Sequence, residues 1–222
     1  MKKYFGVKVS AVIIVLTLLF SCDILNNDDK SSSSNSWDYD SPEEIMDDPE
    51  VDNAITETDF GIYSGTNPPN IEGIYTMSGT VVDSDDSSYI GVAMGSEIEF
   101  YDQTSSTISM IETFLGDEYY GEGYYITGNY GTYFTTWQTA KVENEYDTSQ
   151  YYVVVALISG TILSNGDLDG ESLSVITQKV NLESYYLPTW WQGEVYLEWT
   201  DYTYRSIDEA LQNGLIGNFF TE

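Results

Sequence analysis

The sequence predicts an all-β protein whose body is an antiparallel, up-and-down barrel of about eight strands. Apolar and polar residues alternate along successive short runs from residue 71 to about residue 203, as they do along half-buried strands. Turn-forming residues separate the runs, and no long connection lies between them. A meander of hairpin-linked strands has free edges unless it closes, so a barrel is favoured, with a two-sheet sandwich as the open alternative.

Eight runs predict the individual strands. They span residues 71–80, 92–100, 108–110, 124–127, 133–142, 151–158, 173–178 and 194–199. In the first run, Tyr75 and Met77 share one face with Ile71, and the polar residues between them mark the other face. Residues 151–158 are continuously apolar and predict the most buried strand.

Short helices are expected before and after the strands. Ser41-Pro42-Glu43-Glu44 is a capping box with proline at the first helical position, and Asp48-Pro49 again places a proline after a cap. Asn67-Pro68-Pro69-Asn70 ends anything helical. Ser206-Ile207-Asp208-Glu209 is a further capping box, which predicts one C-terminal helix ending at Asn213-Gly214.

The first 21 residues have the three zones of a secretory signal. Lys2, Lys3 and Lys8 form a positive region, residues 11–20 form an apolar run, and a small serine follows. The apolar run is too short to span a bilayer, which needs roughly 20 apolar residues. Leu19-Phe20-Ser21-Cys22 then resembles a lipobox, the cleavage motif of lipoprotein signal peptides, with Phe20 standing where a smaller residue is usual.

This resemblance implies a bacterial lipoprotein that is cut before Cys22 and carries lipid on the Cys22 thiol. Cys22 is the only cysteine in the chain, so it has no internal disulfide partner. Two or more acyl chains give stable anchoring, where a single chain is marginal. We therefore expect the protein in the bacterial cell envelope, attached to a membrane through lipid, while the choice of membrane and leaflet stays open.

Composition divides the chain into four parts. Residues 1–21 are the expected signal peptide, and residues 22–40 are an acidic, serine-rich tether that we expect to be disordered. Residues 41–70 are a short helical or irregular lead-in. Residues 71–222 are the expected β-barrel domain with its C-terminal helix.

The charge balance restricts the partners. The chain has a formal net charge of −30, and cleavage before Cys22 leaves four basic against 37 acidic residues, a net charge of −33. Such a field repels phosphate backbones and anionic headgroups, so we expect no nucleic-acid binding and a tether made of lipid. Solubility or cation binding is the direct consequence of this charge. The sequence does not indicate an oligomeric state.

The chain contains no histidine, and its single cysteine is assigned to lipid. Catalytic triads, histidine zinc sites and thiolate chemistry are therefore absent from the expected mechanisms. A carboxylate-dependent hydrolase is the remaining enzymatic class. With 37 acidic residues some pair always has suitable spacing, so we assign no catalytic residue and expect a binding protein with no organic cofactor.

The layout resembles the lipocalins, within the calycin group. Gly73-Ile74-Tyr75 stands where lipocalins have Gly-x-Trp on the first strand, with tyrosine in place of tryptophan. Arg205, the sole arginine, follows the last expected strand, where lipocalins place an arginine over that aromatic ring. The resemblance covers residues 68–215 in layout and Gly73, Tyr75 and Arg205 in motif. It implies a cup that binds a small, apolar ligand.

One loop has part of a calcium-binding pattern. Asn165, Asp167, Asp169 and Glu171 place oxygen ligands at alternate positions around Gly166 and Gly170. The position that should supply a bidentate glutamate is Ile176. A hairpin loop built on Asn-Gly and Asp-Gly is the alternative and is the favoured interpretation.

Aromatic residues suggest a further binding mode. Trp190 and Trp191 lie near Tyr185 and Tyr186 in the densest aromatic cluster, and exposed aromatic rings stack on sugars. The alternative is that these side chains fill the barrel core. A cell-surface module that binds glycans or proteins is therefore the second functional hypothesis, beside a lipocalin-like barrel that binds a small ligand.

Substitution of Cys22 tests the expected lipid anchor. We expect Cys22→Ala to move the protein from the detergent phase to the aqueous phase in a detergent phase-separation assay, because the acyl chains are lost. The unsubstituted chain is the reference. Equal partitioning of the two proteins would exclude lipidation at Cys22.

Overall fold

The computed structural model describes residues 39–114, 117–120, 122–144, 147–182 and 187–200. Two helices come first, α1 (Pro42–Met46) and α2 (Pro49–Thr58). The Ser41 hydroxyl accepts a hydrogen bond from the Glu44 amide, and the Asp48 carboxylate accepts one from the Glu50 amide. Both predicted N-terminal caps are therefore confirmed.

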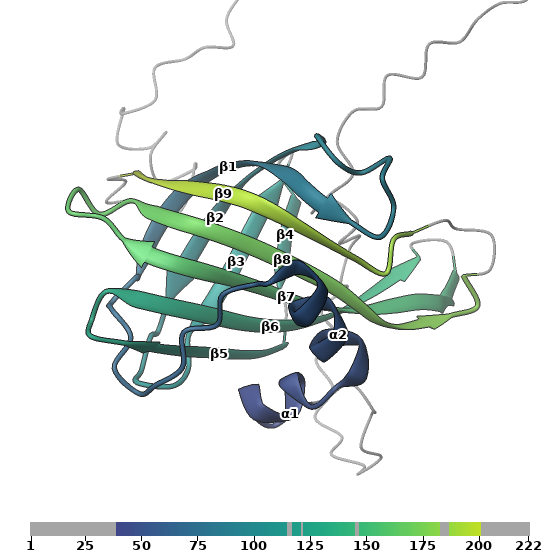
Figure 1. The fold of residues 1–222 in the computed structure, drawn as a ribbon, viewed down its shortest axis with the longest axis horizontal. Helices are drawn as coiled ribbons and strands as arrows, with labels where there is room; N and C mark the ends of the chain where they lie inside the picture. Colours follow the sequence, from purple (N-terminus) through teal and green to yellow (C-terminus); the bar gives the residue numbers. More distant parts are fainter. Residues whose placement is uncertain (1–38, 115–116, 121, 145–146, 183–186, 201–222) are drawn as a thin grey trace, which may run out of the picture.

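Nine strands follow and form one antiparallel sheet (Figure 1). The sheet order is β4-β3-β2-β1-β9-β8-β7-β6-β5. Strands that follow each other in the chain are therefore neighbours in the sheet, except that β4 and β5 lie at its two ends and that β1 pairs with β9. Their bounds are β1 (Gly73–Ser84), β2 (Ala93–Tyr101), β3 (Ser109–Phe114), β4 (Asp117–Tyr120), β5 (Glu122–Asn129), β6 (Tyr133–Asn144), β7 (Asp147–Ile162), β8 (Leu168–Val180) and β9 (Trp190–Thr200).

Two features close the sheet into a nearly complete barrel. The first strand pairs with the last, β1 with β9, from Ile74–Thr200 to Ser84–Trp191. The two sheet ends, β4 and β5, are separated by a single residue in the chain. β4 pairs with β3 and β5 pairs with β6, and a bridge between Thr107 and Tyr125 ties the chain before β3 to β5. β4 and β5 thus together occupy one strand position of the barrel. The barrel therefore has eight strand positions around its axis, as predicted.

Side-chain alternation gives the barrel an apolar interior. Tyr75, Met77 and Val81 of β1 are buried, and the outward-facing Thr76, Ser78 and Thr80 are exposed. The same alternation around the ring forms one inner cluster, which we call the lumen cluster. It includes Ile98, Phe100, Met110, Ile126, Phe134, Tyr152, Val154, Ile158, Leu168, Ile176, Trp191, Val195 and Leu197.

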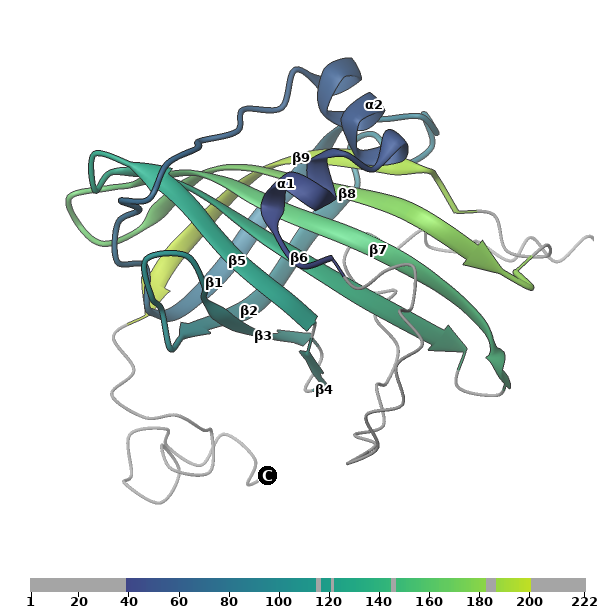
Figure 2. The same cartoon turned by 90° about the horizontal axis from the view of Figure 1, so that it is seen from below.

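The outer wall of the barrel is also covered on one side. Figures 1 and 2 show α1 and α2 lying outside the sheet, across β6, β7 and β8. Their buried side chains pack with outward-facing residues of those strands and of β9 in a second apolar cluster, the outer cluster. It contains Ile45, Val51, Ala54, Phe60, Trp137, Val155, Leu157, Leu173, Val175 and Trp190. The continuous apolar run of β7 is explained by burial on both of its faces.

The segment after α2 closes one end of the barrel, which we call the floor. The Gln103 side chain accepts a hydrogen bond from the Ile71 amide (2.9 Å) and donates one to the Pro69 carbonyl (2.7 Å). Ile71 is fully buried, and its carbonyl accepts a hydrogen bond from the Tyr75 hydroxyl (3.1 Å). The Tyr75 ring meets the Phe100 ring edge-on, with centroids 5.9 Å apart. These contacts pack the end of the lead-in against β1 and the chain that follows β2 at the floor.

Several predicted features lie outside the described residues. These are the signal peptide, Cys22, most of the tether, Arg205 and the C-terminal helix. In the described ranges, neither helix has the length and apolar character that crossing a membrane requires.

Candidate functional site

The lumen contains a carboxylic acid side chain that sequence reasoning did not single out. Glu112 lies on β3 directly opposite Ile98 of β2, and Ile98 lies opposite Tyr75 of β1. Residues opposite each other on paired strands share a face, so Glu112 points into the barrel with these two lumen-cluster residues. Only 2% of its surface is exposed.

Within the part of the chain that the structure describes, the Glu112 carboxylate makes no hydrogen bond of ordinary geometry. Both of its oxygens are buried, and so is the Ser96 hydroxyl, which lies near enough to act on the carboxylate but does not reach ordinary hydrogen-bond geometry. Two basic residues are present in the described ranges, and neither pairs with Glu112. Lys141 forms an ion pair with Glu143, and Lys179 donates to the Leu187 carbonyl (2.9 Å). A carboxylate in this position is costly, because burial removes its hydration and the one nearby described hydroxyl, that of Ser96, compensates only a small part of this loss.

Burial changes the acidity of this group. Desolvation raises the pKa of the Glu112 carboxyl from its ordinary value of 4.5 to about 7, against a smaller lowering effect of the Ser96 hydroxyl. Strongly shifted groups of this kind gather at functional sites, because a structural core has no need of them.

Aromatic side chains line the end of the lumen opposite the floor. Trp191 lies in the lumen cluster, and the Tyr89 ring packs against it with centroids 6.4 Å apart. The Trp191 indole nitrogen is buried and has no acceptor among the residues that the structure describes. Tyr152 is buried nearby, and desolvation followed by the proximity of Tyr89 raises the pKa of its hydroxyl. This end of the lumen therefore offers flat apolar rings together with a free donor.

Small residues on the inner face leave room for larger neighbours. A Cβ atom on Gly193 would lie 2.4 Å from the Met94 sulfur and 3.1 Å from the Ser172 hydroxyl oxygen. Glycine at position 193 therefore lets Met94 of β2 reach across to the inner face of β8 and β9. Met94 is unbranched and has three rotatable bonds, so it can adjust to a guest molecule.

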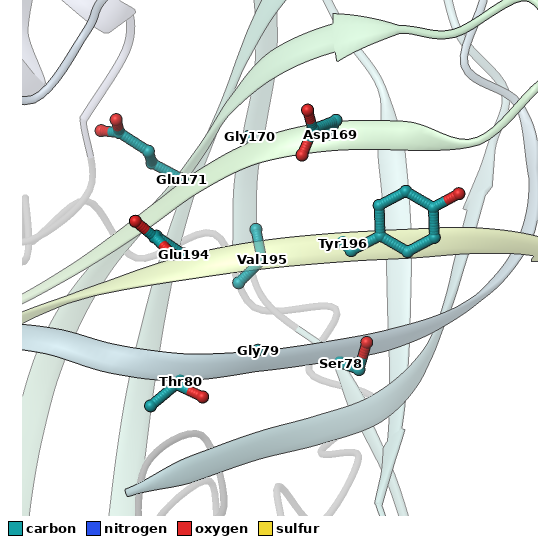
Figure 3. A pocket seen from close by; sticks show the side chains of 9 residues that line it. All are labelled: Ser78, Gly79, Thr80, Asp169, Gly170, Glu171, Glu194, Val195 and Tyr196. Carbon is teal, nitrogen blue, oxygen red and sulfur yellow. The ribbon is translucent and has the colours of Figure 1, made fainter. Parts of the chain in front are cut away.

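A groove of about 700 Å³ lies on the outer wall, over β1, β9 and β8. Figure 3 shows Ser78 and Thr80 of β1, Glu194 and Tyr196 of β9, and Asp169 and Glu171 of β8 along it. Glu171 and Glu194 are directly opposite each other across the strand pair. The groove is open, acidic and rich in hydroxyl groups.

The loop with the partial calcium pattern forms the β7–β8 hairpin. The Leu163 amide donates to the Asp167 carbonyl (2.8 Å), and Gly166 has a positive φ of 93°. The Asp167 carboxylate accepts hydrogen bonds from the Tyr196 hydroxyl and the Trp199 amide, and these bonds lower its pKa. The Asp167 carboxylate is thus already engaged in hydrogen bonds within the chain, while Asp169 and Glu171 line the outer groove.

The hairpin interpretation accounts for the geometry of this loop. No group of three or more histidine, cysteine, aspartate or glutamate side chains gathers as metal ligands within the described ranges. Calcium binding by Asn165, Asp167, Asp169 and Glu171 stays a prediction.

The paired tryptophans do not form an exposed platform. Trp190 is 9% exposed and packs in the outer cluster under the helices, and Trp191 is 5% exposed and points into the lumen. Their expected role in an outer glycan platform is therefore wrong. Consecutive residues on a strand face opposite sides of the sheet, and both sides are covered here. Tyr185 and Tyr186 lie outside the described residues.

The lipocalin-like motif is described only in part. Gly73 begins β1 with a positive φ of 153°, and a Cβ atom there would lie 3.0 Å from the Trp199 indole nitrogen. Tyr75 occupies the floor as an aromatic ring on the first strand. The expected contact between Arg205 and Tyr75 involves a residue outside the described ranges.

A sequence signal for Glu112 existed. The third expected strand spans residues 108–110, and a period of two that continues from Ile108 and Met110 puts Glu112 next on the same face. An acidic residue at an inward position breaks the binary pattern, and such breaks occur at functional sites.

The buried carboxyl predicts an unusual pH dependence of stability. Between about pH 4.5 and pH 7 the unfolded chain has released this proton and the folded chain retains it. The free energy of unfolding therefore falls as the pH rises through this window, by about 3 kcal/mol in total, and levels off above it. We expect Glu112→Gln to remove this fall in urea titrations at a series of pH values.

Glu97→Gln is the matched control, because Glu97 lies on the neighbouring strand β2 and is exposed. It should retain the fall seen in the unsubstituted protein. Parallel stability curves for the unsubstituted and Glu112→Gln proteins would contradict the assignment of the shifted group.

Comparisons with known proteins give no family for this chain. No protein-family model matches it, and neither do curated proteins or solved structures.

Proposed function

We propose that this protein is a membrane-tethered binding protein whose barrel lumen takes a small, largely apolar ligand. The observation that carries the proposal is the set of unpaired polar atoms inside an apolar barrel. Glu112, Ser96 and Trp191 each present a buried polar atom that makes no hydrogen bond of ordinary geometry among the described residues. Native structures pair nearly all such atoms, and a bound ligand is one partner that would satisfy a group of them in one interior.

The composition of the lumen supports a binding role. Small-molecule sites are mostly apolar and contain a few polar groups that set the orientation of the ligand. The lumen cluster supplies the apolar wall through Met77, Met94, Ile98 and similar residues. The unpaired carboxyl, hydroxyl and indole groups supply the orienting contacts.

The fold supports a lipocalin-like mode of binding. Up-and-down barrels of eight strand positions include small-ligand binders, whose interior is just wide enough to hold one small ligand in place of filling side chains. The floor contacts of Ile71, Tyr75 and Gln103 seal one end, so a ligand would enter from the end that carries Tyr89 and Trp191.

The expected lipid on Cys22 would hold the barrel near a membrane surface. Residues 23–40 would connect the anchor to the lead-in that packs on the outer wall, and a random coil of this length reaches on the order of 25 Å. The barrel would therefore work close to a membrane surface, where apolar ligands are concentrated. Binding and carrying such a ligand needs no chemistry, in line with the expectation of a non-enzymatic protein.

A second candidate function has one specific observation in its favour. The outer groove of about 700 Å³ presents hydroxyl groups of Ser78, Thr80 and Tyr196 beside three carboxylates. Carboxylates and hydroxyls are suitable partners for sugar hydroxyls, so a glycan-binding surface would lie here. The buried Trp190 and Trp191 take no part in it.

A pair of serine substitutions separates the two sites. Ser96 points into the lumen, and Ser78 lies on the neighbouring strand β1 and lines the outer groove. We expect the neutral apolar fluorophore phenylnaphthylamine to bind in a saturable manner, at one site per chain. Ser96→Phe should weaken this binding at least about tenfold, because the ring fills the lumen.

Ser78→Phe should leave the affinity unchanged, and circular dichroism should show that both variants are folded. Loss of binding in Ser78→Phe alone would move the apolar site to the outer groove. No saturable binding to any of the three proteins would refute the proposed function.

A further inference from the structure

The chemistry of the lumen restricts the polar part of its ligand. Glu112 presents two acceptor oxygens and, once ionised, no donor. Its described neighbours include Ile98, Met110 and the Ser96 hydroxyl, and neither described lysine reaches it. Tyr119 of β4 is the residue opposite Glu112 in the strand register. A ligand that satisfies this group must therefore donate hydrogen bonds.

The charge of the protein restricts the ligand further. A mature net charge of −33 attracts cations and repels anions at long range, so an anionic amphiphile such as a fatty acid meets an unfavourable field. Inside the barrel, a carboxylate ligand would also lie beside an acid of the same sign. A positively charged group is favoured in both respects, because it compensates the buried carboxylate directly.

The positions of the aromatic rings define the other end of the ligand. Glu112 is in register with the floor residue Tyr75 through Ile98, whereas Tyr89 and Trp191 lie at the opposite end of β1. A chain or ring system that extends from the carboxylate toward these rings passes along Met77, Met94 and Val81. The ligand would thus be polar at its inner end and apolar over the rest of its length.

We propose that the lumen binds a cationic amphiphile, an apolar molecule with a protonated amine at one end, and that the amine pairs with the Glu112 carboxylate. This inference rests on the proposed binding function and specifies the ligand class for the same site. It differs from the expectation of a purely apolar ligand, because it assigns the specificity to one charged contact. Charge-assisted hydrogen bonds are roughly twice as strong as neutral ones, so the contact dominates the choice of head group.

The test compares three molecules of equal chain length: dodecylamine, dodecanol and dodecanoate. Each is titrated below its micelle concentration against phenylnaphthylamine bound to the protein, at about pH 8, where Glu112 and the amine are both charged. We expect dodecylamine to bind at least about tenfold more tightly than dodecanol, and dodecanoate to bind most weakly.

Two variants locate the contact. Glu112→Gln should bind dodecylamine and dodecanol equally, because the amide keeps the shape and removes the charge. Glu97→Gln removes one exposed carboxylate from the outer face of the adjacent strand and should retain the preference for the amine. Moderate salt should weaken the amine preference only slightly, since a buried pair is screened much less than a surface pair.

A proton measurement gives an independent readout. At about pH 6 most of the Glu112 carboxyl is protonated, so pairing with an ammonium group should release close to one proton per site. Calorimetry of dodecylamine binding in two buffers of different ionisation enthalpy measures this number. The Glu112→Gln protein should release none.

The outcomes separate the two levels of the argument. Equal affinities for dodecylamine and dodecanol in the unsubstituted protein, or an amine preference that survives in Glu112→Gln, would overturn the assignment of the ligand class while the binding function stands. Failure of all three molecules to displace the fluorophore or to bind directly would overturn both.

Discussion

The pairing of β1 with β9 is the constraint on which the rest of the structure depends. It joins the first strand to the last and turns a linear meander into a ring. A ring has an inside, and the alternation of side chains then separates a lumen from an outer wall. Because β4 and β5 share the remaining position, the ring is complete enough to exclude water from Glu112, which is 2% exposed. The unusual properties of that carboxyl follow from this closure, through loss of hydration.

The lead-in, residues 41–70, has two structural roles that could not be predicted from its sequence. Its helices cover the outer faces of β6–β8, which allows those strands to be apolar on both sides. The segment that follows α2 then crosses the wall. The Tyr63 amide donates to the Thr135 hydroxyl (2.9 Å), and the Asn67 amide donates to the Gly128 carbonyl (3.1 Å), before the chain reaches the floor at Ile71. The same short segment therefore protects a free edge of the sheet beside β5 and closes one end of the barrel.

Much of the fold could be predicted from local patterns. The helix caps at Ser41 and Asp48 and the inward face of Tyr75 and Met77 follow from spacing alone, and the structure confirms them. The division of one barrel position between β4 and β5 could not be predicted, because the residues around it combine glycines, acids and tyrosines that are also typical of turns. Trp190 and Trp191 were misplaced because burial of both sheet faces is a tertiary property. Glu112 was missed because a charged residue on a strand is usually assigned to the solvent face.

The methionines of the chain offer the most direct test of a ligand-binding lumen. Met77, Met94 and Met110 lie in the lumen cluster, whereas Met46 packs on the outer cluster. In a protein labelled with carbon-13 on its methionine methyl groups, titration with dodecanol should shift the NMR signals of the three lumen methionines. The signal of Met46 should stay in place. Shifts confined to Met46, or no shift of Met77, Met94 and Met110 at saturation, would contradict the account.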